Sequence, residues 1–258
     1  MKIGSLLWAS LSASACCSIV SAEKITIDIQ GNHETIAKLE RLTFIKKDDF
    51  EKTADFTRRL CEQTHETLGT SEKNPITIGL DPGPDGTGVR YNADNQTFVI
   101  QVLGGGNYFY AGNGLSDQFR WNISFDPHKY EGIRIAEKYG EASSTYAGKN
   151  AFGASKDVKV GFETAAALFF LPKNRDGLKI MLPSKPEDAR RIEKELRVAV
   201  IARVQPPCFV SGQGHKPPTM GYAYDLTLTT VGIVAAPNPE WVLYLDSTKE
   251  ILKRGRFR

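Results

Sequence analysis

Histidine and cysteine are scarce in this sequence, and no long apolar run follows residue 23. The chain has four residues of each kind, and they do not form the two ligand pairs that a four-coordinate structural zinc site uses. We therefore predict no metal site. Because no later apolar run is long enough to cross a bilayer, we also predict no transmembrane segment beyond the N-terminus.

Three motifs that carry well-understood chemistry are also absent. No serine lies in a G-x-S-x-G elbow, no H-E-x-x-H pair is present, and the glycines at 104–106 are followed by Asn-Tyr-Phe where a P-loop has Gly-Lys-Ser/Thr. We therefore predict no cofactor. The formal net charge is only +3, and much of the basic excess lies in the last ten residues, so the charge predicts no nucleic-acid partner.

The first 22 residues have the pattern of a signal peptide. Lys2 supplies the positive end, residues 3–20 are mostly apolar or small, and V-S-A precedes the expected cut after Ala22. We therefore expect a periplasmic or secreted protein. Two alternatives stay open: an uncleaved membrane anchor, which the serines in the run disfavour, and a lipid anchor on Cys16, since the A-S-A-C run resembles a lipobox.

Cleavage after Ala22 leaves two cysteines, Cys61 and Cys208. An even pair in an oxidising compartment is a candidate disulfide, and closing so long a loop is worth on the order of 4–5 kcal/mol at most. Two free buried thiols are the alternative. Cys61 and His65 also lie on one face of a predicted helix, where two metal ligands could sit, but we expect Cys61 to be a core residue or disulfide partner and His65 to be exposed.

The clearest structural pattern is a strand, a helix and a strand over 178–204. Ser184 and Glu187 match the S-x-x-E capping box, and Pro186 suits the first helical turn. These residues predict a helix over about 185–197, followed by the β-branched V-A-V-I run.

A second main helix is predicted over about 53–68, with Thr53 as its N-cap and Gly69 as its end. Most other segments alternate apolar and polar residues or flank turn residues, as in the hairpin around 92–96. Strands thus outnumber helices, and we predict an α+β fold with a mostly antiparallel β-sheet. Residues 23–258 are expected to form a single domain, with a possible internal boundary near 104–114.

Five segments resemble a group of uncharacterised exported, periplasmic bacterial proteins of unknown function. They are F-I-K-K-D-D-F-E-K-T-A-D-F-T-R-R at 44–59, Y-N-A-D-N-Q-T-F-V-I at 91–100, G-K-N-A-F-G at 148–153, the P-E-D-A-R helix with its V-A-V-I strand, and W-V-L-Y-L-D-S-T-K-E-I-L at 241–252. The resemblance implies an envelope location and one domain. It implies no catalytic residue.

Two stretches are candidate sites. His215 lies in S-G-Q-G-H-K-P-P at 211–218, where we expect a loop that lets backbone approach a ligand, so His215 is the candidate catalytic residue. Asn107, Tyr108 and Tyr110 lie in the Gly-rich stretch and are candidate binding residues, because amide and phenol side chains give adaptable contact surface. The alternatives are a loop held by prolines and aromatics that fold back onto the sheet.

The leading hypothesis is a non-catalytic binding or scaffold module of the bacterial envelope, with an unknown envelope protein or ligand as its partner. One rival is a small periplasmic hydrolase or transferase whose site surrounds the 211–218 segment. The other is a lipid-anchored envelope component. The sequence leaves open whether the chain is an enzyme, but the absence of catalytic motifs leans against enzymatic activity.

Overall fold

The structure is a computed structural model that describes residues 23–80, 88–101, 108–109, 120–123, 125–126, 129–149, 155–171, 179–219 and 221–257. The predicted signal peptide with Cys16 lies outside the described residues. So do Asn107, Tyr110 and most of the proposed boundary at 104–114.

Three helices accompany the strands among the described residues. They are α1 (His33–Leu42), α2 (Thr53–Leu68) and α3 (Pro186–Glu195). The expected α+β fold is confirmed, and α2 has the predicted bounds. Gly69 ends α2 in the left-handed region, with φ of 66°, as predicted for a C-terminal glycine.

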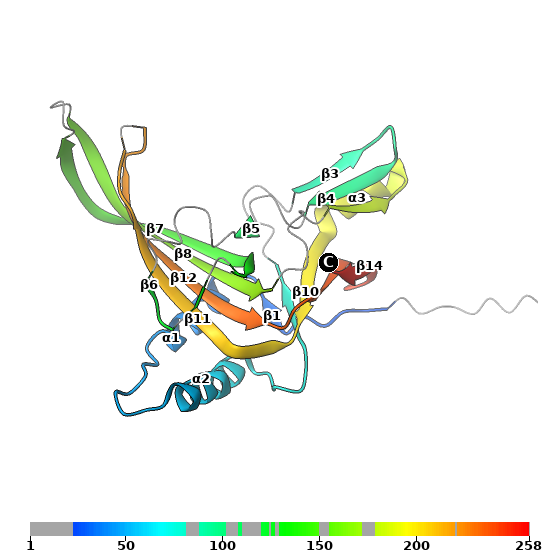
Figure 1. Ribbon diagram of the computed structural model, residues 1–258. Coiled ribbons are helices and arrows are strands. Elements are labelled where there is room, and N and C mark those ends of the chain that lie inside the picture. The colour runs from blue at the N-terminus through cyan, green and yellow to red at the C-terminus, as the bar shows by residue number, and fades with distance from the viewer. Residues whose placement is uncertain are drawn as a thin grey trace, which may run out of the picture.

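The strands form three sheets (Figure 1). The five-stranded sheet contains, in order, β1 (Ile29–Gln30), β2 (Ile76–Gly79), β10 (Leu196–Ala202), β13 (Glu240–Leu245) and β14 (Ile251–Arg256). The three-stranded sheet contains β3 (Gly88–Asn92), β4 (Thr97–Gln101) and β9 (Lys179–Pro183). The six-stranded sheet contains β5 (Tyr108–Phe109), β7 (Glu131–Lys149), β8 (Ser155–Phe170), β12 (Tyr224–Ala235), β11 (Val204–Lys216) and β6 (Arg120–Trp121).

The six-stranded sheet joins two long hairpins through one parallel pair. β7 and β8 are antiparallel, β11 and β12 are antiparallel, and β8 runs parallel to β12 from Lys159↔Tyr224 to Phe169↔Val234. The starts of β8 and β12 therefore lie at the same end of the sheet. The two hairpins project from the helices and the other sheets at this end (Figure 1).

One cluster of buried side chains links the helices to all three sheets. It includes Leu39 of α1, Leu60 of α2, Val198 of β10, Ile100 of β4 and Leu168 of β8. A smaller cluster around Phe125 and Phe169 covers the other face of the six-stranded sheet. The apolar alternation in the sequence therefore builds a continuous core between the sheets and the helices.

A disulfide fastens α2 to the six-stranded sheet. Cys61 on the buried face of α2 is bonded to Cys208 of β11, with a Cα–Cα distance of 5.1 Å. This confirms the predicted pairing and removes free thiols as the alternative. It also removes Cys61 as a metal ligand.

The predicted capping box is wrong. α3 begins at Pro186 after Lys185, which makes no side-chain cap bond, and it ends at Glu195. Ser184 sits one residue too early because its backbone N–H donates to the carbonyl of Gln96, 2.9 Å away, in continuation of the β4–β9 pairing. Its hydroxyl donates to the Lys185 carbonyl.

The predicted N-cap of α2 is also displaced by one residue. The Phe56 N–H donates to the Lys52 carbonyl at 3.0 Å, so Lys52 takes the cap position and Thr53 is the first helical residue. Within the described part of the chain, no helix has the length and apolar character needed to cross a membrane.

Candidate functional site

A pocket of about 330 Å³ lies between the two long hairpins. The β7–β8 hairpin contributes one wall and the β11–β12 hairpin the other. Its lining residues are Tyr139, Gly140 and Glu141 of β7, Phe162 and Glu163 of β8, and Tyr222, Tyr224 and Leu226 in and just before β12. The hydrophobic clusters of the core include none of these residues.

The strand register explains how these side chains converge. Tyr139 lies directly opposite Glu163, and Glu163 lies opposite Leu228 in the parallel pair. Glu141 and Leu226 flank Gly161 in the same way. Directly opposed residues project from the same face of a sheet, and because Gly161 has no side chain the Leu226 side chain lies over it, with its Cδ2 atom 2.9 Å from the position that a Cβ on Gly161 would take.

The β7 wall carries a hydrogen-bonded charged group. The Tyr139 hydroxyl donates to Glu137 Oε2 at 2.7 Å, and Arg134 forms an ion pair with the same oxygen. Burial, followed by the bond to Glu137, raises the pKa of the Tyr139 phenol above its usual range. The phenol is therefore a hydrogen-bond donor at neutral pH.

Glu163 is the half-buried carboxyl group of the pocket. Burial raises the pKa of Glu163, and the nearby Glu137 carboxylate raises it further. Lys216 and Arg134 act in the opposite direction but do not cancel the effect. Among the residues that the structure describes, Glu163 has no hydrogen bond or ion pair, so this group is available to a ligand.

Lysine ammonium groups lie over the aromatic rings of the pocket. Lys216 Nζ is 4.1 Å from the centre of the Tyr222 ring, and Lys159 Nζ is 5.7 Å from that of Tyr224. Both distances are within the range of cation–π attraction. The centres of the two tyrosine rings lie 5.4 Å apart and the rings are tilted by 47°, so this part of the site already holds positive charge against a pair of aromatic rings.

The expected loop at 211–218 is wrong, because residues up to Lys216 continue strand β11. Gly212 and Gly214 pair with Thr230 and Leu228 of β12. This backbone pairing with a distant strand makes the segment a strand, although its glycines are typical of a loop. His215 is thus a strand residue. It lies opposite Thr227, not on a loop between strands.

His215 belongs to a polar cluster separate from the pocket. Its Nε2 atom bonds to Asp225 Oδ1, and the Tyr146 hydroxyl donates to Asp225 Oδ2 at 2.8 Å. The Tyr146 bond, followed by the His215 bond, lowers the pKa of Asp225. The His215 side chain is 59% exposed, and the pocket lining does not include it. The cluster therefore holds an oriented imidazole at the surface.

The candidate binding residues of the Gly-rich stretch are only partly described. The backbone of Tyr108 pairs with Ile133 in strand β5, at the edge of the six-stranded sheet. Asn107 and Tyr110 lie outside the described residues, so binding by this stretch stays a prediction. The expected exposure of His65 is wrong, because the residue lies on the buried face of α2 and its Nδ1 atom bonds to the Thr70 hydroxyl at 3.1 Å. In the described part of the chain, no three metal-binding side chains are grouped to hold an ion.

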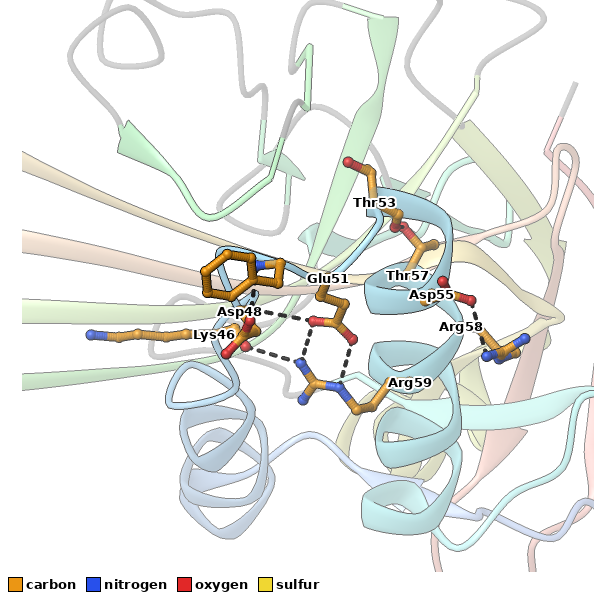
Figure 2. Close-up of polar contacts among 9 residues, drawn as sticks. Lys46, Asp48, Glu51, Thr53, Asp55, Thr57, Arg58 and Arg59 are labelled. Atoms are coloured by element: carbon orange, nitrogen blue, oxygen red, sulfur yellow. Dashed lines mark hydrogen bonds and ion pairs between the residues drawn. The ribbon is translucent and has the colours of Figure 1, made fainter.

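The segment between α1 and α2 is organised by Arg59. Its guanidinium donates to both Glu51 carboxylate oxygens, at 2.7 and 3.0 Å, and to the Lys46 carbonyl at 3.0 Å (Figure 2). The side chains of Phe44 and Phe50 are 80% and 97% exposed on this segment. Its Glu51, Arg59 and Lys46 groups bond to one another, so this segment is a surface loop held by an ion pair and hydrogen bonds.

A second cavity of about 360 Å³ lies beside the turn at Pro237 and Pro239. Its charged residues include Glu240 and Arg256, which bond to each other at 3.2 Å. The hairpin pocket is the better candidate, because it combines several aromatic rings with a carboxyl group that has no partner among the described residues.

Comparison with protein-family models, with curated proteins and with solved structures finds no match for this chain. The candidate site therefore rests on its own geometry. The sequence pattern does not predict this pocket, because its walls are brought together by the long-range parallel pairing of β8 and β12. One local pattern was available: glycine, an aromatic residue and glutamate occur together at 139–141 and again at 161–163.

Proposed function

We propose that this chain is an exported bacterial envelope protein that binds a small molecule in the pocket between its two long hairpins. The observation that carries the proposal is the pocket itself, where tyrosines and the half-buried Glu163 line a volume of about 330 Å³. A few polar groups among apolar and aromatic walls are typical of small-molecule sites.

Two features support export. The N-terminal 22 residues have the composition of a signal peptide, and the resemblance to exported bacterial proteins agrees with it. The Cys61–Cys208 disulfide favours an oxidising compartment, because cytosolic thiols are normally kept reduced. A lipid anchor on Cys16 is the alternative form of export. If Cys16→Ala leaves the membrane-bound fraction unchanged, the anchored form is excluded.

Binding is tested with the mature protein by backbone-amide NMR against a library of small molecules of mixed charge. The expected result is a ligand that shifts amides of 139–141, 161–163 and 222–226. A Tyr222→Ala, Tyr224→Ala double variant should weaken it, whereas Tyr91→Ala, in the three-stranded sheet, should not. If every ligand found acts on other residues, the pocket is not the site.

A hydrolase or transferase is the second candidate, and the Asp225–His215 bond favours it. A carboxylate that orients an imidazole is the arrangement of a general base. Turnover of ester, amide and phosphoester substrates would be measured with His215→Ala and with His33→Ala as the control. Turnover lost only in the His215 variant would replace binding with catalysis as the function.

A further inference from the structure

Glu163 provides the first indication of what the pocket binds. Its carboxyl group lies among aromatic and aliphatic side chains, half-buried and without a hydrogen bond or ion pair to any described residue. A carboxylate taken out of water without a partner is unfavourable, and a ligand that supplies a positive charge would remove that penalty.

The charges around Glu163 are largely matched already. Arg134 pairs with Glu137, and Lys159 Nζ lies 3.5 Å from Glu141. Neither Glu163 nor Lys216 forms an ion pair with a described residue, although the Lys216 charge acts on Glu163 from a greater distance. Lys216 contacts the face of Tyr222, so Glu163 is the pocket charge that a ligand can neutralise.

The tyrosine rings of the pocket provide the second indication. The Lys216 and Lys159 ammonium groups lie over Tyr222 and Tyr224, so the protein itself places two cations on the aromatic surface of this site. A lysine stem is flexible, and its ammonium group is readily hydrated. A ligand cation can therefore take the place of Lys216 on the Tyr222 ring while Lys216 moves into solvent.

We propose that the pocket binds a small organic ammonium ion, whose cationic group lies against Glu163 and the face of Tyr222 and displaces the Lys216 ammonium. This inference rests on the proposed function, because it names the ligand class of the same pocket. The apolar part of the ligand would pack on Leu226 and on the exposed ring of Tyr139.

The test is a titration of the mature protein at pH 7 with tetramethylammonium and with 1,4-diaminobutane, followed by backbone-amide NMR. Methyl α-glucoside is the neutral comparison and inorganic phosphate the anionic one. Glu163→Gln should weaken cation binding about tenfold or more, because a charge-assisted contact is lost. Glu240→Gln, in the second cavity, is the matched control and should have no effect.

Lys216→Met separates a cation site from an anion site. Removing a competing ammonium from Tyr222 should tighten cation binding about two- to fivefold, the size of an exposed cation–π contact. Lys249→Met removes a similar contact, 5.4 Å from the Tyr244 ring and away from the pocket, and should change nothing.

Several outcomes overturn the inference. Cation binding that Glu163→Gln leaves unchanged does so, and so does phosphate binding that Lys216→Met abolishes. If methyl α-glucoside or another neutral molecule shifts the pocket amides and the cations do not, the ligand class is wrong but the proposed function stands. If neither these probes nor the library shifts those amides, both fail.

Discussion

The ring of Phe162 lies across Gly140, the residue directly opposite it on the neighbouring strand. A methyl group on Gly140 would overlap two atoms of that ring. The absence of a side chain therefore lets Phe162 lie along the sheet, where it forms part of the pocket lining. The Phe162 ring can take this position only because residue 140 is a glycine.

Gly140→Ala should displace the Phe162 ring and lower the free energy of unfolding by about 1–3 kcal/mol, the usual range for overpacking. Urea denaturation monitored by circular dichroism measures the change. Gly221→Ala is the control, since no atom lies within 4 Å of the added methyl position. Equal midpoints for the two variants would show that the ring moves aside freely.

Reduction of the Cys61–Cys208 disulfide should destabilise the protein strongly. The bond joins residues 147 apart, and by chain entropy such a loop is worth on the order of 4–5 kcal/mol at most. Urea midpoints with and without a reductant, and of a Cys61→Ala, Cys208→Ala double variant, measure the loss. Alkylation should add two groups only after reduction. Two groups added without reductant would contradict the pairing.

Arg59→Ala should loosen the segment between α1 and α2 without unfolding the domain. Arg59 holds Glu51 and the Lys46 carbonyl together, so the Asp48 and Phe50 amides should exchange hydrogen faster in the variant. Arg58→Ala is a matched control, because the Arg58 side chain bonds to Asp55 on its own helix and to no other residue that the structure describes. Similar exchange in both variants would deny Arg59 this role.

The same ion pair gives the segment a pH dependence. The hydrogen bond from the Arg59 guanidinium lowers the pKa of Glu51. The stabilisation that this ion pair gives to the segment is therefore present above the ordinary carboxyl pKa of 4.5 and is lost as the pH falls through the lowered pKa of Glu51. Exchange of the Phe50 amide, corrected for intrinsic rates, should therefore accelerate only in acid.

Glu163→Gln should stabilise the protein at neutral pH. The raised pKa of Glu163 means that the folded state favours the protonated carboxyl, so this group's stabilisation is full below the ordinary pKa and is lost as the pH rises through the raised value. Burial is the main cause of the raised pKa, the Glu137 carboxylate adds to it, and Lys216 and Arg134 oppose it. A neutral amide avoids the loss, so Tm should rise by about 1–2 °C at pH 7 and be unchanged at pH 4. A lower Tm at pH 7 would contradict the shift.

Local chemistry made much of the fold predictable. The helix over 53–68, the end at Gly69 and the hairpin around 92–96 each depend on residues a few positions apart. The disulfide was predictable because only two cysteines follow the expected cleavage site. The two N-cap predictions failed by one residue each, since the backbone hydrogen bonds that involve Gln96 and Lys52 decide where each helix begins.

Long-range pairing explains what the sequence did not predict. Residues 138–149 are polar and rich in glycine and serine, yet they extend β7 because β8 pairs with nearly the whole strand. The S-G-Q-G-H-K run becomes β11 for the same reason. The pocket depends on the parallel register of β8 and β12, and strand alternation within either segment carries no information about that partner.

The two walls of the pocket come from separate hairpins, so each wall can vary in sequence independently of the other. One wall of the pocket is encoded within 139–163 and the other within 222–226, and neither contributes to the hydrophobic clusters. A gene library that varies one segment at a time would therefore sample half of the pocket while leaving the framework of α2, its disulfide and the shared core intact. Mutational drift can act on the same two segments, so ligand preference can diverge between descendants of this chain faster than their fold.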